Sequence, residues 1–361
     1  MIKNLIDLED LPFTDLKEII TLAGKIKDKP GNYREVCRGK IMATLFYEPS
    51  TRTQMSFQTA MLRLGGQTIG FDNPMNSSVA KGESLKDTIK IISGYADIIA
   101  MRHPLEGSAK AASLFSSVPL INGGDGGHLH PTQTLTDLVT LYNEKGRLDH
   151  LCIGLCGDLK NGRTVHSLIK TMSHFPDNRF ILISTDELGV PNYIKDTLHA
   201  AGCKYEEINN LRDAMPLLDV LYMTRIQRER FASEEEYKKQ QGIFVLDTKK
   251  LSLGKKDLKI LHPLPRVDEI GNDVDDDSRA IYFKQAVYGM YARMALIMLM
   301  LERPLQSDEP LTHTHIQRCQ NPKCITSSEE YLPHAFCGQG DMLICKSVSY
   351  THLTLPTIYS V

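Results

Sequence analysis

The amino-acid sequence predicts an α/β protein built from two doubly wound, parallel-sheet domains with a cleft between them. Short apolar runs alternate with helical patterns from residue 41 to residue 301. Such alternation favours parallel strands that helices cover on both faces. The alternation occurs in two series joined by one long helical pattern, which indicates two domains. Four of the eight cysteines then crowd into positions 319–345, which indicates a small additional segment at the C-terminus.

The first series supplies the elements of one domain. Its strand-like runs lie at 41–46, 68–71, 97–101 and 118–122, and its helical patterns lie at 51–64, 84–95 and 107–115. A long helix is predicted at 131–144, because Pro131 suits a first helical position, where the missing N–H would have no partner. We assign residues 1–145 to this domain and expect a final helix at 285–301 to complete it.

The second series supplies the other domain. Its strand-like runs lie at 151–155, 179–184, 204–208, 220–224 and 258–261, again with helical patterns between them. We assign residues 146–284 to this domain. Residues 303–318 are polar and contain prolines, which is typical of a linker.

Composition excludes several classes of function. Lys+Arg number 42 and Asp+Glu number 44, so the net charge of −2 gives no general attraction to nucleic acid or to an anionic membrane. No apolar run reaches the ~18–20 residues of a membrane span, and the N-terminus lacks the layout of a signal peptide. We interpret the scattered Cys37, Cys152, Cys156 and Cys203 as reduced, packed side chains, and we expect a cytoplasmic protein.

Polar segments that follow predicted strands carry the candidate functional residues of the first domain. Residues 50–53 (Ser-Thr-Arg-Thr) begin a helix, and the N–H groups of a helix N-terminus bind anions. Lys81 lies in a polar loop, and Arg102 lies at the carboxyl end of a strand, where ligands of α/β sheets bind. His130 follows the glycine-rich run 123–127, which lets backbone approach a ligand closely. For residues 50–53 the alternative is an ordinary capped helix with a solvated arginine. For Lys81 it is an exposed, mobile loop, and for His130 it is a histidine with a purely structural role.

The second domain repeats this arrangement. Arg163, Arg225, Gln227 and Arg266 all follow predicted strands. Taken singly, each arginine is more simply a surface residue. Together, however, five arginines lie at predicted sheet edges in a chain whose net charge is −2, and this indicates a site for an anionic ligand. They are Arg52, Arg102, Arg163, Arg225 and Arg266.

Seven motifs in this order carry a family resemblance: F-x-E-P-S-T-R-T, S-x-x-K-G-E, M-R-H-P, H-P-T-Q-T-L-x-D, G-D-L-K-x-G-R-T-V-H-S, Y-M-T-R-x-Q and H-P-L-P-R-V-D-E-I. Together they resemble the catalytic chain of aspartate carbamoyltransferase over about residues 1–302. That family transfers the carbamoyl group of carbamoyl phosphate to L-aspartate in pyrimidine biosynthesis, giving N-carbamoyl-L-aspartate and phosphate. The resemblance implies an active-site cleft between the domains, no cofactor for catalysis, and a homotrimer whose chains share active sites; a higher assembly stays open.

The resemblance also implies a role for each matched residue. Carbamoyl phosphate would be bound by Ser50, Thr51, Arg52, Thr53, Ser78, Arg102, His130, Gln133 and the backbone carbonyls of Leu264 and Pro265. Aspartate would be bound by Lys81, Arg163, Arg225 and Gln227. The groups expected to act in catalysis are Arg52, Thr53, Lys81, Arg102 and His130. Ser78 and Lys81 would come from a neighbouring chain.

Two alternatives to this function stay open. Ornithine carbamoyltransferase shares the fold and the first substrate, but it typically has a cysteine in the H-x-L-P element and acidic groups for an amino side chain. Here the element is His262-Pro263-Leu264-Pro265, and cationic Arg163 and Arg225 suit a dicarboxylate. A catalytically silent scaffold is the second alternative, and the intact set of motifs argues against it.

The C-terminal cysteines resemble part of another protein. Cys319-x4-Cys324 is similar to the zinc-binding domain of the family's separate regulatory chain, which holds a structural zinc with four cysteines. Cys345 would be the third ligand, and the fourth is expected at position 348, which is valine. We predict an incomplete zinc-ribbon-like segment at 319–346, which would hold structural zinc only if it were complete. Residues 347–361 resemble a translated transposon adapter and are predicted to be a non-native tail; a native β-rich tail is the alternative.

Overall fold

The computed structural model describes residues 3–302, 319–329, 331–339, 342–348 and 350–353. The chain forms two compact units. The first comprises Met1–Leu16, Lys29–Pro131 and Arg293–Val361, and the second comprises Lys17–Asp28 and Thr132–Ala292. The predicted linker at 303–318 lies outside the described residues, as do residues 349 and 354–361 of the predicted tail.

The first unit is built on a five-stranded parallel sheet. In spatial order its strands are β1 (Asn4–Leu5), β5 (Leu120–Asp125), β4 (Ile98–His103), β2 (Ile41–Phe46) and β3 (Gln67–Phe71). Most side chains of β2 and β4 are buried, as expected for central strands of a parallel sheet that is covered on both faces.

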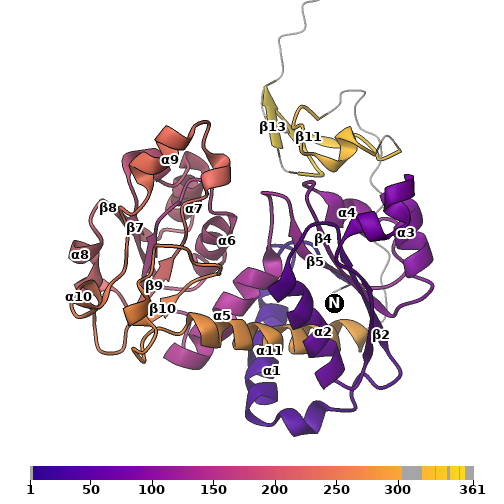
Figure 1. Ribbon diagram of the computed structural model, residues 1–361, viewed down its shortest axis with the longest axis horizontal. Helices are drawn as coiled ribbons and strands as arrows, with labels where there is room; N and C mark the ends of the chain where they lie inside the picture. Colours follow the sequence, from indigo (N-terminus) through magenta and orange to yellow (C-terminus); the bar gives the residue numbers. More distant parts are fainter. Residues whose placement is uncertain (1–2, 303–318, 330, 340–341, 349, 354–361) are drawn as a thin grey trace, which may run out of the picture. The chain divides into compact units, whose positions relative to one another are not determined.

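Three helices of this unit follow the strands. They are α2 (Thr51–Arg63), α3 (Leu85–Ile92) and α4 (Ser108–Ser113). α2 packs against β2 and β3, and α4 packs against β4 and β5 (Figure 1). Ser84 caps α3, because its side chain accepts a hydrogen bond from the backbone N–H of Asp87.

The second unit has the same architecture. Its parallel sheet has the order β10 (Lys259–Leu261), β9 (Val220–Met223), β6 (Cys152–Cys156), β7 (Arg179–Ile183) and β8 (Lys204–Ile208). Five helices lie between successive strands of this unit in the chain: α6 (Arg163–Met172), α7 (Asn192–Ala200), α8 (Leu211–Ala214), and, both between β9 and β10, α9 (Glu234–Gln240) and α10 (Thr248–Leu251). Two parallel-sheet α/β units confirm the predicted fold class.

Three longer helices contain residues of both units. They are α1 (Phe13–Asp28), α5 (Pro131–Lys145) and α11 (Tyr282–Leu301). Among the described residues, none of the helices combines the length and the apolar character that a membrane crossing requires.

The C-terminal segment forms a small antiparallel sheet of β11 (Phe336–Gln339), β12 (Met342–Cys345) and β13 (Tyr350–Leu353). β13 therefore lies within the predicted non-native tail, where the alternative prediction expected β structure. Ile325 and Leu332 are buried in the same apolar cluster as Leu85 and Ala109, so this segment packs on the first unit.

Candidate active site

α2 presents its N-terminus at the carboxyl end of β2. Ser50 occupies the N-cap position, but its side chain makes no capping hydrogen bond. N–H groups that lack a side-chain cap can bind an anion, and the helix dipole favours negative charge at this end. The predicted phosphate-binding residues 50–53 therefore lie where a phosphate group would be stabilised.

Arg52 and Arg102 place two positive charges near this helix end. The pKa of the Arg52 guanidinium is lowered, first by partial burial and second by the charge of Arg102. Two like charges that disfavour each other are both stabilised when an anion binds to them. Guanidinium groups also donate several hydrogen bonds in one plane, which suits phosphate oxygens. The pair is therefore suited to an anionic ligand.

The Arg102 side chain is held by three acceptors at the end of β4. Its Nε donates to Oε1 of Glu48 at 2.7 Å, and only 14% of the Arg102 side chain is exposed. Its Nη1 lies 3.4 Å from the backbone oxygen of Gly123 and 3.3 Å from Nε2 of His130. The structure thus brings the predicted Arg102 and His130 together. Sequence reasoning missed Glu48, although this carboxylate lies inside the motif that precedes α2.

The glycine-rich run before His130 approaches this group closely. A Cβ on Gly124 would lie 3.1 Å from Nη1 of Arg102, and the φ of +124° is one that L side chains rarely adopt. Asp125, which is 1% exposed, accepts hydrogen bonds from the N–H groups of Gly107 at 2.8 Å and Leu129 at 3.1 Å. Asp125 therefore fixes the loop that leads into α5, a role that the sequence did not reveal.

Ser78 and Lys81 lie on the surface of the first unit. They begin and end a short 3-10 helix, Ser78–Lys81, which Ser77 caps by accepting a hydrogen bond from the N–H of Val79 at 3.3 Å. Both side chains are exposed. An exposed position is what a contribution to a neighbouring chain would need.

In the second unit, Asp158 organises the turn between β6 and α6. This buried carboxylate accepts hydrogen bonds from the backbone N–H of Asn161 at 3.0 Å and from its Nδ2 at 3.1 Å. Nε2 of Gln227 donates to the backbone oxygen of Asn161 at 3.0 Å. α6 begins at Arg163, and Arg225 precedes Gln227 by two residues in the loop after β9. Since β6 and β9 are neighbours, Arg163, Arg225 and Gln227 belong to adjacent loops of one sheet edge, whereas Lys81, also predicted to bind aspartate, lies on the first unit.

A histidine–glutamate pair holds the loop after β10. The N–H of Leu264 donates to Nδ1 of His262 at 2.7 Å, and Nε2 of His262 lies 2.6 Å from Oε1 of Glu269. Because Nδ1 accepts, Nε2 carries the ring proton and donates a hydrogen bond to Glu269. Burial opposes ionisation of Glu269, but the hydrogen bond and electrostatic attraction of His262 and the hydrogen bonds from backbone N–H groups together outweigh it, so the pKa of Glu269 is lowered. Leu264 has a φ of 52°, and its peptide bond to Pro265 is cis.

Gln133 lies in the first turn of α5. Its Nε2 donates to Oδ1 of the buried Asp137 at 2.8 Å. Sequence reasoning did not assign a role to Asp137, which ends the motif H-P-T-Q-T-L-x-D.

Arg266 is a correction to the sequence analysis. Its Nη2 donates to Oδ2 of Asp275 at 2.6 Å and to Oδ1 of Asn272 at 3.2 Å, and its Nη1 donates to the Tyr282 hydroxyl at 3.1 Å. The hydrogen bond with Asp275 raises the pKa of Arg266. The interpretation of five arginines as one ligand set is therefore wrong for Arg266, because neighbouring side chains occupy its guanidinium.

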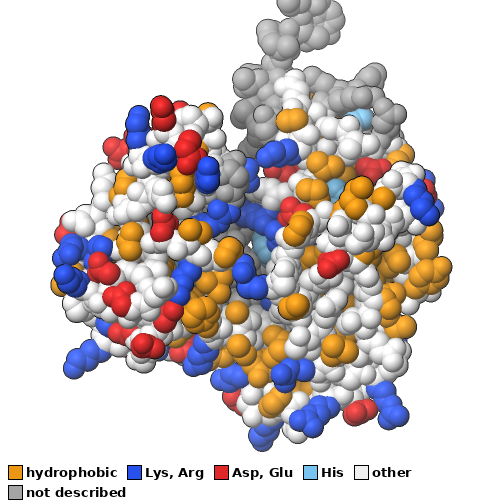
Figure 2. Space-filling view, in the orientation of Figure 1, with side chains coloured by type: hydrophobic (Ala, Val, Ile, Leu, Met, Phe, Trp, Pro, Cys, Tyr) orange, Lys and Arg blue, Asp and Glu red, His pale blue; other side chains and the backbone are white. Residues whose placement is uncertain are grey.

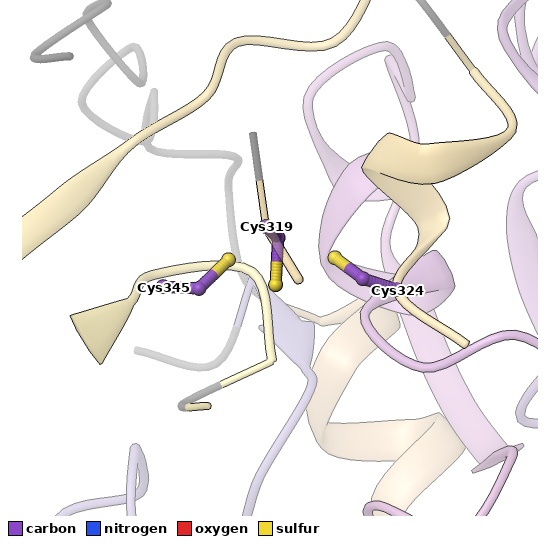
Figure 3. A group of neighbouring side chains, drawn as sticks. All are labelled: Cys319, Cys324 and Cys345. Atoms are coloured by element: carbon purple, nitrogen blue, oxygen red, sulfur yellow. The ribbon is translucent and has the colours of Figure 1, made fainter. Parts of the chain in front are cut away.

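The predicted metal ligands come together in the C-terminal segment. Cys319, Cys324 and Cys345 are buried, and their sulfur atoms lie within 4.8 Å of one another. The sulfur atoms of Cys324 and Cys345 point toward Cys319 (Figure 3). Hydrogen bonds from Cys319 and then Cys324 lower the pKa of the Cys345 thiol. Val348 is buried in the same cluster, so the residue at the expected fourth position lies beside the three cysteines.

Comparison with protein families identifies both units. Residues 3–143 match the aspartate/ornithine carbamoyltransferase carbamoyl-P binding domain, and residues 149–300 match the Asp/Orn binding domain of the same family.

Individual relatives agree with this match. The aspartate carbamoyltransferase catalytic subunit of Clostridium novyi is 56% identical over 299 residues, which cover 83% of this chain and 98% of the relative. That of Lachnoclostridium phytofermentans is 57% identical over 300 residues, with the same coverage.

Solved structures of this enzyme have the same fold. The catalytic subunit of M. jannaschii aspartate transcarbamoylase is 48% identical with a TM-score of 0.79, covering 83% of this chain and 98% of that chain. The Trypanosoma cruzi enzyme in complex with carbamoyl phosphate is 36% identical with a TM-score of 0.77, and the match covers 82% of this chain and 95% of that chain. The chain therefore belongs to the aspartate carbamoyltransferase family of transferases.

Proposed function

We propose that this chain transfers the carbamoyl group of carbamoyl phosphate to the amino group of L-aspartate, giving N-carbamoyl-L-aspartate and phosphate, in pyrimidine biosynthesis. The observation that carries the proposal is the grouping of Arg52, Arg102 and His130 beside the uncapped N-terminus of α2. Structures of the T. cruzi relative with carbamoyl phosphate and with carbamoyl aspartate and phosphate support it.

The first unit supplies what an acyl phosphate needs. The N-terminus of α2, with residues 50–53, binds the phosphate and stabilises it as it leaves. Arg102, His130 and Thr53 direct hydrogen-bond donors at the carbamoyl oxygen, where negative charge develops as the amine attacks. A preorganised donor at such an oxyanion typically contributes ~3–4 kcal/mol. The leaving phosphate itself accepts the proton of the amine.

The second unit selects the acceptor. Arg163, Arg225 and Gln227 bind the two carboxylates of aspartate, and cationic groups repel the side-chain ammonium of ornithine. Gln133 and the carbonyls of Leu264 and Pro265 bind the amide of the carbamoyl group.

Steady-state turnover of carbamoyl phosphate with aspartate or with ornithine tests this proposal. We expect carbamoyl-aspartate to form and carbamoyl-ornithine to stay near background. Turnover of ornithine would assign the chain to the other branch of the family, and turnover of neither would favour a silent scaffold.

We also propose a homotrimer in which Ser78 and Lys81 complete a neighbour's site. Hydrophobic side chains are exposed on the first unit (Figure 2). Met55 on α2 is 60% exposed, and Ile69 lies on the edge strand β3. Exposed apolar groups beside an open sheet edge are typical of a subunit interface.

We also propose a cytoplasmic location. All eight cysteines lie in the described residues and none forms a disulfide, which is typical of a reducing compartment.

For the C-terminal segment we propose a zinc site that lacks one ligand. Structural zinc in proteins takes four ligands, and here three sulfur atoms converge while the apolar side chain of Val348 packs against them. Substituting this residue by cysteine would supply the missing thiolate. The test is described with the other predictions below.

A further inference from the structure

Asp137 is a buried carboxylate on α5 that receives hydrogen bonds from three different elements of the second unit. Its Oδ1 accepts from Nε2 of Gln133 at 2.8 Å and from Nε2 of Gln285, on α11, at 2.6 Å. Its Oδ2 accepts from the hydroxyl of Tyr222, on β9, at 3.0 Å. Asp137 and Tyr222 are fully buried, and Gln285 is 1% exposed. Three donors on two oxygens is the arrangement that a carboxylate needs when water is excluded.

Tyr222 can act only as a donor toward this carboxylate. Burial, and then the negative charge of Asp137, raise the pKa of Tyr222 well above its usual value, so the phenol keeps its proton. Tyr222 thus donates to Oδ2, and the two amides donate to Oδ1.

This arrangement decides which way the amide of Gln133 faces. A side-chain amide has an NH2 donor on one side and an oxygen acceptor on the other, and a carboxylate only accepts. If the Gln133 amide turned over, its Oε1 would face Oδ1 of Asp137, and two acceptors would repel each other. The amide is therefore fixed with its NH2 toward Asp137, and Oε1 is the atom left to receive a hydrogen bond from a ligand.

The same carboxylate reaches the loop after β10. Oε1 of Gln285 accepts the N–H of His262 at 2.9 Å, and Nδ1 of His262 accepts the N–H of Leu264 at 2.7 Å. Leu264 and Pro265 carry the two backbone carbonyls assigned to the carbamoyl amide. The groups assigned to the carbamoyl amide are Oε1 of Gln133 and the carbonyls of Leu264 and Pro265. All three are hydrogen-bond acceptors, and all three are linked to Asp137 through hydrogen bonds or the 262–265 loop.

We propose that Asp137 is a positioning residue that makes the enzyme selective for an acyl phosphate bearing an amide over one bearing a methyl group. This inference rests on the proposed function of Gln133. The NH2 of carbamoyl phosphate donates to the acceptors that Asp137 orients, whereas the methyl group of acetyl phosphate, which has nearly the same shape, cannot. Asp137 itself touches neither substrate and acts through Gln133 and the 262–265 loop.

The test compares the affinities for carbamoyl phosphate and acetyl phosphate, measured by calorimetry, in the wild-type protein and three variants. In Asp137→Leu the acceptor is lost, so Gln133 is free to turn over. We expect carbamoyl phosphate affinity to fall about tenfold, as for one lost hydrogen bond, with acetyl phosphate affinity unchanged. In Asp137→Asn, Oδ1 can still accept from both glutamines while Nδ2 donates to the Tyr222 hydroxyl, so selectivity should be retained.

Thr140→Val is the matched control, because it removes another buried side-chain donor of α5, which donates to the backbone oxygen of Thr136 at 2.7 Å, and leaves Asp137 and Gln133 in place. If Asp137→Leu does not fold, as judged by its circular dichroism and melting temperature, Asp137→Ser replaces it, since a short hydroxyl cannot reach Gln133. Equal loss of affinity for both ligands, or unchanged selectivity in a folded variant, overturns the inference.

Failure of the inference and failure of the proposed function are distinguishable. The wild-type turnover assay decides the function, whereas the ratio of the two affinities decides the role of Asp137 and needs no turnover. A wild-type protein that binds carbamoyl phosphate no more tightly than acetyl phosphate also overturns the inference.

Discussion

Nη1 of Arg102 lies 3.3 Å from Nε2 of His130, so two of the groups assigned to the carbamoyl oxygen already face each other in the free protein. Arg102 is thus held beside the histidine before substrate binds.

For this pair we predict that His130→Ala lowers kcat about 10²–10³-fold, because one donor to the developing oxyanion is lost. The inhibition constant of inorganic phosphate should change little, since the phosphate is bound by α2 and Arg52. His199→Ala, a change at an exposed histidine of α7, is the control and should keep full activity. A His130→Ala enzyme with normal kcat would contradict the assignment.

For aspartate selection we predict that Arg225→Ala raises the KM for aspartate at least thirtyfold, which corresponds to ~2 kcal/mol for a lost charged hydrogen bond. The KM for carbamoyl phosphate should stay within about twofold. Arg212→Ala, at an exposed arginine of α8, is the matched control. An equal rise in the KM for aspartate and for carbamoyl phosphate would show that the role of Arg225 is not specific to the acceptor.

Acid stability should depend on His103. Burial lowers the pKa of His103 to about 4, and its Nδ1 accepts a hydrogen bond from the Leu105 N–H. The unfolded chain binds a proton near pH 6.5 and the folded chain does not, so stability is lost as the pH falls from about 6.5 toward 4. This residue alone should cost the wild-type protein about 2 kcal/mol between pH 7.5 and pH 5.0.

Urea unfolding at both pH values, in wild type and in His103→Gln, measures this effect. The variant is less stable at pH 7.5, but it should lose less stability on acidification. Identical pH dependence in the two proteins would rule out His103 as the cause.

Zinc binding should depend on position 348. The unmodified chain is expected to bind zinc weakly, because the group of ligands among the described residues has three cysteine sulfur atoms where a structural zinc needs four ligands. Val348→Cys should bind about one zinc per chain, as a closed four-ligand site does. Zinc content after dialysis against a weak chelator measures this, with Cys337→Ser, at an exposed cysteine, as the control. Tight, stoichiometric zinc in the unmodified chain would refute the idea of a missing ligand.

Mixed trimers test the sharing of active sites. Arg52→Ala and Lys81→Ala should each be nearly inactive. When the two variants are dissociated and reassembled together, some sites combine an intact Arg52 from one chain with an intact Lys81 from another, so activity should return. A tag on one variant reports whether mixed trimers form. Mixed trimers without recovered activity would mean that Lys81 acts within its own chain.

The sequence predicted the sheets better than the ends of the chain. The strands at 41–46 and 204–208 have the predicted bounds, because each apolar or alternating run is closed by turn residues. β1 (Asn4–Leu5) was missed, since two residues carry no periodicity and only pairing with β5 makes them a strand. α1 (Phe13–Asp28) was not predicted either.

Within the site, sequence position identified residues but not their partners. Arg102 and Glu48 are separated by 54 positions and form an ion pair at 2.7 Å, which no local motif encodes. Arg266 has the same sequence context as Arg225, at the end of a strand, yet Asp275 occupies it. The partners of an arginine depend on which groups the tertiary structure brings near, and sequence spacing alone does not show them.

The backbone of Glu106 pairs with the cysteine-bearing segment: its N–H donates to the oxygen of Lys323 at 2.8 Å, and its oxygen accepts the N–H of Ile325 at 2.9 Å. Lys86 and Lys110 add hydrogen bonds to Tyr331 and Lys346. Because this segment is tethered to the surface that it covers, its effective concentration there is on the order of millimolar. A separate protein that recognises this face of α3 and α4 must therefore compete with a part of the same chain, and a weak partner will not displace it.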